Sequence, residues 1–488
     1  MPLIMRLRCH TSLSIVLVLS LLPAAALAGL QAKLEATISK AKFSQRHVSV
    51  AVRECGSPHL LAAISASTPR IPASNQKLLT TGAAALVLGA DFRFSTQLLH
   101  SGPNLIVVGD GDPALGDDML LARMTLPDGK KLTATGLVDL WAASVAKAGI
   151  QHVDALIVDD RVFDRDWTPA EWPSEQLRNA YCAQVAGVNF NHNTVKIKVK
   201  PTGNTVVIKD MQPPYSGVTL VNTLKRVNRK NRLEINPQRN QGSNTIRLSG
   251  NVPVANQVPV EVTIDNPPLQ FGMLLADRMR LIGVSVGAVR LATEADPPAS
   301  GTPVAPPIQT ALADVLQRCN HESENMFGEA LLKRIAHHTT HRSGTRTAGS
   351  RIVTGLVEQR AGSADGLRVA DGSGMSTHNR VSARTMTGWL CSFDPAVPNE
   401  NLFIKSLSQH NQGKVKKRLS SIDSKGTTVR VKSGFINNVY TLGGYVECMG
   451  GRRISFSIMI NTPSKRNTWE LRRGLLQVII NHACSPAQ

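Results

Sequence analysis

SNQKLLTTGAAALVLG, residues 74–89, is a run of small and apolar residues that opens with a serine and a lysine three positions apart. The run stops at Gly89 and predicts a buried helix whose first turn carries Ser74 and Lys77 on one face. A serine hydroxyl is a weak nucleophile that needs an adjacent base. A lysine can be that base if burial or a nearby cation lowers its pKa. The stretch therefore indicates a serine nucleophile that lysine activates.

The Ser-x-x-Lys pattern is weak by itself, because Ser39 and Lys42 also match it. No apolar helix follows that second match, and we interpret it as a coincidence. Two further motifs support the interpretation of Ser74 as the catalytic serine.

Ser323-Glu324-Asn325 lies in a predicted turn between two helical stretches. A hydroxyl and an amide presented together can relay a proton and orient a lysine. The alternative is structural, since Ser323 could cap a helix over Met326–His337.

Lys432-Ser433-Gly434 ends the alternating strand pattern of residues 428–432. A cation and a hydroxyl can bind a carboxylate there, and the glycine lets a substrate backbone approach closely. The alternative is an edge-strand lysine followed by a turn glycine. If this strand lies beside the Ser74 helix, Lys432 is the cation that lowers the pKa of Lys77.

Residues 1–28 have the pattern of a secretory signal, with a basic start, an apolar run over Leu13–Leu22 and the cleavage-site triplet Ala26-Leu27-Ala28. The alternative is an uncleaved membrane anchor, but the apolar run is short and meets Pro23, whereas a spanning helix needs about 20 apolar residues. No cysteine follows the triplet, which disfavours a lipid anchor. We expect an exported, periplasmic protein with at most peripheral membrane contact.

The chain has 488 residues and a net charge of +20, and only 4% of its residues are aromatic. The length suggests two or three domains. The positive charge favours binding to a polyanion such as an anionic cell envelope. The alternative is that the charge only keeps the protein soluble. Nucleic acid is not the expected partner, because no zinc-finger or RNA-binding signature appears.

Six cysteines follow the predicted signal, and none form a Cys-x-x-Cys pair, so we expect no metal site. His337, His338 and His341 have helical spacing but are better interpreted as a polar helix end. Disulfides are compatible with export. Their pairing stays open, since six cysteines allow 15 connectivities.

The chain changes character along its length. Residues 95–295 contain short strand patterns, and residues 192–264 are strongly β-like, with clean alternation at 195–199 and 260–264. A linker rich in proline follows at Pro297–Pro307. The C-terminal part predicts an antiparallel meander and then a closing helix over Thr468–His482.

Together the three motifs resemble the S-x-x-K, S-D-N and K-T-G set of penicillin-binding proteins and class A β-lactamases. Further stretches resemble the class C low-molecular-mass penicillin-binding proteins of the penicillin-binding protein 4 type, a family of peptidoglycan D-Ala-D-Ala carboxypeptidases and endopeptidases. These stretches are GDGDP at 109–113, VNFN at 188–191, DGSGMSTHN at 371–379 and the loop 413–418. The 245 residues between Lys77 and Ser323 agree with the class C resemblance, because this long insertion marks class C members and related β-lactamases have a far shorter spacer.

The resemblance implies an α/β fold, with a transpeptidase/β-lactamase-like domain in which helices flank an antiparallel sheet. It also implies two inserted, mainly β domains, the second nested in the first. We therefore expect a catalytic domain from residues 29–94 and 296–488. Inserted domain II would comprise residues 95–191 and 265–295, and nested domain III residues 192–264.

The resemblance also implies roles for the motif residues. Ser74 attacks the carbonyl of the penultimate D-Ala, and Lys77 takes its proton. Ser323 helps to return a proton to the leaving D-Ala amine, while Asn325 orients Lys77 and the substrate amide. Lys432 completes the catalytic set.

Substrate binding is assigned to the strand that carries the third motif. Lys432 and Ser433 would hold the terminal carboxylate, beside Gly434. The backbone N–H groups of Ser74 and Phe435 would form the oxyanion hole, in which one donor is typically worth about 10²–10³ in rate.

The chain departs from the family pattern at several positions. Glu324 replaces an aspartate and Ser433 a threonine, which leaves the chemistry of both motifs in place. Phe435 stands where a small hydroxyl residue is common, and Thr377 stands where arginine is frequent, so carboxylate and side-chain recognition can differ. Asp159 aligns roughly with an acidic residue that meets the free amine of a diaminopimelate stem; the alternative is a surface aspartate after a strand.

The expected function is an exported serine D-alanyl-D-alanine carboxypeptidase that acts on peptidoglycan stem peptides and is acylated by β-lactams without a cofactor. Whether it also cuts cross-links as a D,D-endopeptidase does not follow from the sequence. One alternative is a β-lactamase or esterase on the same fold. Another is a non-catalytic, basic peptidoglycan-binding protein. Oligomeric state does not follow from the sequence.

Overall fold

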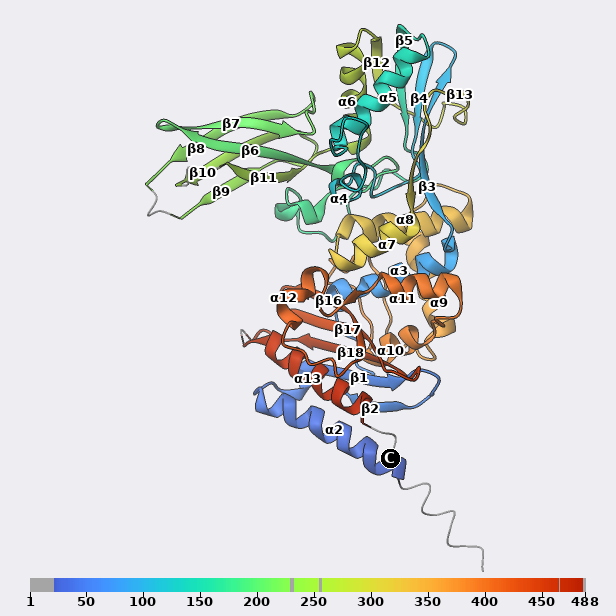
Figure 1. Ribbon diagram of the computed structural model, residues 1–488, viewed down its shortest axis with the longest axis vertical. Coiled ribbons are helices and arrows are strands. Elements are labelled where there is room, and N and C mark those ends of the chain that lie inside the picture. The colour runs from blue at the N-terminus through green and yellow to red at the C-terminus, as the bar shows by residue number, and fades with distance from the viewer. Residues whose placement is uncertain (1–21, 229–231, 254–256, 465, 486–488) are drawn as a thin grey trace, which may run out of the picture.

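The computed structural model describes residues 22–228, 232–253, 257–464 and 466–485. Three six-stranded sheets and a helical layer make up an elongated molecule (Figure 1). The predicted signal lies outside the described residues up to position 21, and its last residues belong to helix α2 (Leu22–Lys40). Among the described helices, none combines the length and apolar character that a membrane crossing requires.

The first sheet joins the two ends of the chain in the order β15-β16-β17-β18-β1-β2, and every pair in it is antiparallel. Its N-terminal strands are β1 (Val48–Glu54) and β2 (Leu60–Ile64). Its C-terminal strands are β15 (Ser408–Gln409), β16 (Thr428–Ile436), β17 (Val439–Glu447) and β18 (Arg453–Asn461). Alternate strand residues face opposite sides, and both faces are buried, which explains the near-continuous apolar runs of β17 and β18.

Helices cover both faces of this sheet. On one face, α2 and α13 (Thr468–Ala483) pack together and share a core with Val429, Val431 and other strand residues. On the other face lie α3 (Gln76–Leu88) and α10 (Ala383–Cys391). Beyond them come α7 (Leu312–His321), α8 (Asn325–Thr340), α9 (Arg346–Arg360) and α11 (Pro398–Ser406) (Figure 1). This arrangement confirms the expected antiparallel sheet between helices.

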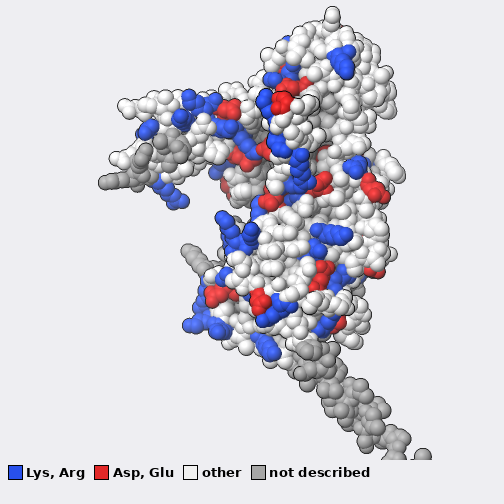
Figure 2. Space-filling model, viewed as in Figure 1, with Lys and Arg blue, Asp and Glu red and all other residues white. Residues whose placement is uncertain are grey.

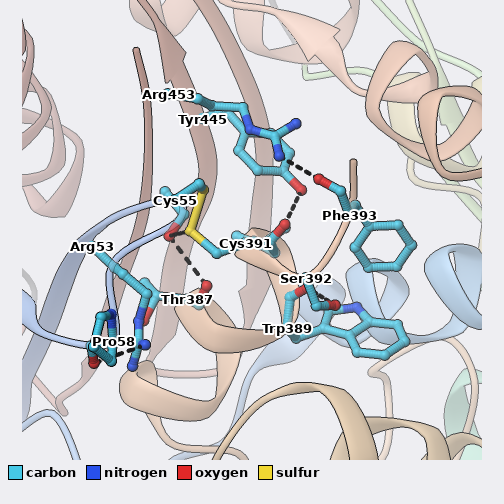
Figure 3. Close-up of a disulfide and its surroundings, with 12 residues drawn as sticks. Arg53, Cys55, Pro58, Thr387, Trp389, Cys391, Ser392, Phe393, Tyr445 and Arg453 are labelled. Carbon is cyan, nitrogen blue, oxygen red and sulfur yellow. Dashed lines mark hydrogen bonds between the residues drawn. A yellow bond between two sulfur atoms is a disulfide. The ribbon is translucent and has the colours of Figure 1, made fainter. Parts of the chain in front are cut away.

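A disulfide between Cys55 and Cys391 joins the end of β1 to the end of α10 (Figure 3). The sequence left the pairing open, and the fold decides it by bringing together residues 336 positions apart. Nearby, the Tyr445 hydroxyl donates to the Leu390 carbonyl at 2.6 Å, and Ser455 donates to the Thr387 carbonyl at 3.1 Å. The other four cysteines in the described part of the chain are free thiols.

The second sheet has the order β12-β5-β4-β3-β13, with β14 also paired to β3. Its members are β3 (Arg93–Ser101), β4 (Asn104–Val108), β5 (His152–Asp159), β12 (Ser285–Leu291), β13 (Thr302–Pro303) and β14 (Ile308–Ala311). The short α4 (Asp118–Leu121) precedes α5 (Ala134–Lys147), and α5 packs with α6 (Pro267–Leu281). The prediction of a linker over Pro297–Pro307 is partly wrong, because β13 lies within this range and pairs with β3.

The third sheet has the order β11-β6-β7-β8-β10-β9 and projects to one side (Figure 1). Its strands are β6 (Thr194–Thr202), β7 (Thr205–Gln212), β8 (Thr219–Arg226), β9 (Glu234–Gln238), β10 (Thr245–Val252) and β11 (Val258–Thr263). The first and third sheets lie within the ranges expected for the catalytic domain and for domain III, whereas β13 and β14 add residues of the expected catalytic range to the second sheet. The domain boundaries stay predictions.

Basic side chains are spread over the face in Figure 2, including the projecting third sheet. Exposed examples on that sheet are Lys198, Lys200, Lys209 and Lys225. The positive charge of the chain is therefore partly carried by a surface outside the helical layer.

Candidate active site

Ser74 lies in a short 3-10 turn, Ala73–Asn75, directly before α3. The sequence placed Ser74 at the helix start, and it lies two residues before Gln76, where α3 begins. The turn is held closely: the Thr441 hydroxyl donates to the Pro72 carbonyl at 2.9 Å. Ala73 has a φ of +46°, and a Cβ on Gly374 would lie 1.9 Å from the Ala73 carbonyl oxygen, so only glycine fits against this turn.

Lys77 is fully buried one turn further along, and its Nζ lies 3.3 Å from Ser74 Oγ. The same nitrogen donates to Asn325 Oδ1 at 2.7 Å and to the Ser373 carbonyl at 2.6 Å. Burial lowers the pKa of Lys77, although the acidic groups of Cys319, Asp371 and Glu329 oppose the shift. A neutral amine has two protons and one lone pair. Two acceptors for the protons leave the lone pair for the Ser74 hydroxyl.

Ser323 and Lys432 form a second pair beside the first. Lys432 is almost fully buried, and its Nζ donates to Ser323 Oγ at 2.7 Å and to the Ser433 carbonyl at 3.0 Å. Burial, and then the charge of Lys77, hold the pKa of Lys432 well below its usual range. Helix α8 begins at Asn325 without a side-chain cap, so Ser323 does not take the capping role that was its alternative. Its φ of +61° marks a special turn conformation.

Strand β16 touches the Ser74 turn at Gly434. A Cβ there would lie 2.8 Å from the Ser74 backbone nitrogen and 2.3 Å from Thr441 Oγ1. Only glycine allows this approach, which places the backbone before Phe435 next to the Ser74 N–H. The side-chain amide of Asn75 joins this turn to the sheet. It donates to Thr441 Oγ1 and to the Lys432 carbonyl, and it accepts from the Gly443 N–H.

The DGSGMSTHN stretch, residues 371–379, forms a loop whose function the sequence did not reveal. Asp371 organises it by accepting from the Gly374 N–H at 2.7 Å, the Ser376 N–H at 2.6 Å and the Asn379 amide at 2.8 Å. The result is that the Ser373 carbonyl points at Lys77.

Glu329 was also missed. It is fully buried on α8, and its Oε1 accepts from the Ser373 N–H at 2.8 Å. Its Oε2 has no hydrogen-bond partner among the residues that the structure describes. Burial, and then the charge of Asp371, raise the pKa of Glu329 to about 7. An acidic residue six positions after Ser323, on the predicted helix, was the only signal in the sequence.

The range expected for inserted domain II reaches the site as well. The Asn325 amide donates to the Tyr181 carbonyl at 2.9 Å, and the neighbouring Cys182 contacts Met375. This contact was not predicted, because a backbone carbonyl has no sequence signature.

Asp159, at the end of β5, is not brought into this cluster. Its carboxylate pairs with Arg161 at 2.6 Å and lines a cavity of about 760 Å³ with Asp110, Glu294 and His337, away from the motif residues. The contact between Asp159 and a stem-peptide amine stays a prediction. The Asp159 carboxylate already pairs with Arg161. Throughout the described ranges, His, Cys, Asp and Glu side chains do not gather in groups of three that suit a metal ion.

The structure therefore brings together five side chains from the turn before α3 and its first residues, from the residues at and just before the start of α8, and from β16: Ser74, Lys77, Ser323, Asn325 and Lys432. The site thus contains two pairs, each made of a hydroxyl and a buried amine. Such pairs can carry out acyl transfer in which lysine is the base.

The comparisons with known proteins agree with this class. The model of the D-Ala-D-Ala carboxypeptidase 3 (S13) family matches residues 30–479, and the chain belongs to this family. The expected resemblance and the expected enzyme class, a serine-type D-Ala-D-Ala carboxypeptidase, are thereby confirmed.

Individual relatives cover most of the chain. It is 29% identical over 421 residues to a D-alanyl-D-alanine carboxypeptidase of Actinomadura sp.. The aligned region covers 80% of this chain and 73% of the relative. It is 23% identical over 432 residues to the D-alanyl-D-alanine carboxypeptidase DacB of Haemophilus influenzae, with 82% of each chain covered.

Solved structures show the same fold. Penicillin-binding protein 4 of H. influenzae superposes with a TM-score of 0.73 at 21% identity, covering 89% of this chain and 96% of that one. The same protein complexed with a β-lactam gives a TM-score of 0.69 at 21% identity, with 88% and 96% covered.

Proposed function

We propose that this chain is an exported D,D-carboxypeptidase that removes the terminal D-Ala from peptidoglycan stem peptides through an acyl-enzyme on Ser74. The observation that carries the proposal is the position of Lys77 Nζ, which is buried and lies 3.3 Å from Ser74 Oγ while two fixed acceptors hold it. The two relatives named as carboxypeptidases support the substrate class.

Acylation follows from this geometry. Neutral Lys77 accepts the Ser74 proton as Oγ attacks the carbonyl of the penultimate D-Ala. The developing oxyanion binds the N–H groups of Ser74 and Phe435, whose backbones the close contact at Gly434 brings together. Preorganised donors of this kind typically contribute about 10²–10³ in rate each.

The Ser323–Lys432 pair serves the leaving group. Because Lys432 donates to Ser323 Oγ, the Ser323 proton is free to move to the leaving D-Ala amine. Lys432, with Ser433, also attracts the terminal carboxylate, while Asn325 orients Lys77 and the substrate amide. The proton that Lys77 took from Ser74 then replaces the one that Ser323 gave to the D-Ala amine, which leaves Lys77 neutral. Water attacks the acyl-enzyme, and Lys77 serves again as the base.

Penicillin is proposed as a covalent inhibitor that forms the same ester on Ser74. The β-lactam complex of the H. influenzae protein supports this, as does the shared fold. The proposed location is the periplasm, after cleavage of the signal, where the basic surface would meet anionic peptidoglycan. The proposal includes D,D-endopeptidase action on cross-linked peptides.

The test is intact-mass spectrometry of the purified mature protein with benzylpenicillin. We expect one long-lived adduct on the wild type, and none on Ser74→Ala. Ser39→Ala is the matched control, since Ser39 is the exposed serine of the other Ser-x-x-Lys match and its variant should form the adduct normally. Release of D-Ala from a pentapeptide, and cleavage of a cross-linked dimer, would then be followed by chromatography.

The other outcomes favour the alternatives. Rapid loss of penicillin without an adduct would indicate a β-lactamase. Neither adduct nor hydrolysis, with peptidoglycan binding intact in Ser74→Ala, would indicate a non-catalytic binding protein.

A further inference from the structure

Glu324 and Lys414 form an ion pair at the outer edge of the active site. Lys414 Nζ lies 3.6 Å from Glu324 Oε1, and the lysine and glutamate side chains are 58% and 29% exposed. Glu324 directly follows Ser323, and Lys414 belongs to the segment between β15 and β16. The ion pair therefore joins the Ser323 turn to the segment that leads into β16.

The backbone around Lys414 is firmly anchored. Gly413 has a φ of +56°, and a Cβ there would lie 3.0 Å from Ser408 Oγ and 3.1 Å from the His321 carbonyl oxygen. On the other side of Lys414, Val415 is buried in the core that α13 covers. The lysine side chain thus extends toward Glu324 from a fixed base.

The Ser323 turn, by contrast, needs support from its surroundings. Ser323 has a φ of +61°, and α8 begins after it without a side-chain cap. A residue with a side chain keeps this left-handed conformation only where neighbouring groups hold it, because the conformation itself is unfavourable. Two side-chain contacts hold the turn: Lys432 Nζ donates to Ser323 Oγ at 2.7 Å, and Lys414 pairs with Glu324 from outside the helical layer.

We propose that Lys414 is a positioning residue, which acts through Glu324 to keep the Ser323 hydroxyl against Lys432. The inference rests on the proposed function, in which the Ser323 proton moves to the leaving amine. That transfer requires the hydroxyl to stay aligned with both the Lys432 amine and the leaving group, since a hydrogen bond weakens steeply once its alignment is lost. Lys414 itself contacts no reacting atom in this role.

The expected effect is moderate, because both side chains are partly exposed. Exposed ion pairs typically change an equilibrium by about two- to fivefold. Reversal of one charge replaces attraction by repulsion, so Lys414→Glu and Glu324→Lys should each lower the acylation rate constant by about five- to tenfold. The double variant restores an attractive pair and should return to within about twofold of the wild type.

The experiment measures acylation by benzylpenicillin and cleavage of diacetyl-L-Lys-D-Ala-D-Ala in the wild type, both single variants and the double variant. The loss should appear in kcat and in the acylation rate constant, with KM changed by less than about twofold, because the substrate contacts stay in place. Lys416→Glu is the matched control. It makes the same charge change at an exposed position on α12 (Lys416–Leu419), and its rates should equal those of the wild type.

Urea denaturation of each variant verifies that it is folded under the assay conditions. Lys414→Gln removes the charge without repulsion, and it should lower the acylation rate constant by about two- to fivefold. This milder variant provides the measurement if a charge reversal impairs folding.

The signs of the effects separate positioning from attraction of an anionic substrate. If Lys414 only attracted the substrate carboxylate, Glu324→Lys would lower KM, whereas Lys414→Glu and Lys416→Glu would both raise it. This pattern would overturn the inference, as would single variants with wild-type rates or a double variant that is slower than either single one.

The wild type distinguishes the two proposals. Normal acylation and cleavage in the wild type, with unchanged rates in the variants, refutes only the role of Lys414. Absence of both reactions in the wild type refutes the proposed function, and this inference with it.

Discussion

Glu329→Gln should make the stability of the protein less sensitive to pH. The wild-type carboxyl is fully buried, and its pKa rises from 4.5 to about 7 because burial and Asp371 disfavour the charge. Glutamine has nearly the same shape and keeps an oxygen for the Ser373 N–H, which now binds Glu329 Oε1 at 2.8 Å. The substitution therefore removes the titration and keeps the main contact.

The sign follows from the proton balance. Below pH 4.5 the carboxyl is protonated in both the folded and the unfolded chain, and it has no effect on the pH dependence. Between this pH and about 7, the unfolded chain releases the proton while the folded chain retains it, so the wild type loses stability as the pH rises. The shift corresponds to roughly 3 kcal/mol in the free energy of unfolding at and above neutral pH.

The assay is urea denaturation of wild type and Glu329→Gln at several values between pH 4 and pH 8. We expect the difference in unfolding free energy to change in favour of the variant by up to about 3 kcal/mol across this range and then to level off. Glu358→Gln, at an exposed position on α9, is the control and should show no such change. A difference that is independent of pH, or that favours the wild type as the pH rises, would refute the reasoning.

Three further substitutions test the site and the scaffold. Lys432→Met removes the amine that donates to Ser323 Oγ at 2.7 Å, so proton transfer to the leaving group should slow and penicillin acylation should fall by at least about tenfold, as measured by stopped-flow or quenched-flow. Gly434→Ala places a Cβ 2.8 Å from the Ser74 nitrogen, and we expect acylation to slow by at least about tenfold and urea stability to fall by about 1–3 kcal/mol. Cys55→Ser opens the bond to Cys391 and should cost about 2–5 kcal/mol of stability in oxidising buffer, measured by denaturation.

Each has an outcome that would contradict it. Acylation of Lys432→Met at the wild-type rate would mean that Ser323 works without this amine. Normal acylation by Gly434→Ala would mean that β16 can shift away from Ser74. Equal stability of Cys55→Ser and the wild type would contradict the disulfide, and Cys448→Ser, which removes a free thiol, provides the comparison.

Much of the fold was accessible from local patterns. The extended patterns near the C-terminus and the apolar run after Lys77 predicted β16–β18 and α3 correctly, although helices bury both faces of the sheet that β16–β18 belong to. The linker expectation failed at β13, since a two-residue strand is too short to show a period and exists only because the edge of β3 is available.

The sequence by itself determined which side chains carry the chemistry: the spacing of Ser74 and Lys77 is local, and the motifs at Ser323 and Lys432 carry their own functional groups. Tertiary structure alone decided what surrounds them. The Ser373 carbonyl that holds Lys77, and the Tyr181 carbonyl that holds Asn325, are backbone groups, and every residue has the same one. Burial, which lowers the pKa of Lys77 and raises that of Glu329, likewise depends on segments far apart in the chain, and so only the folded structure sets it.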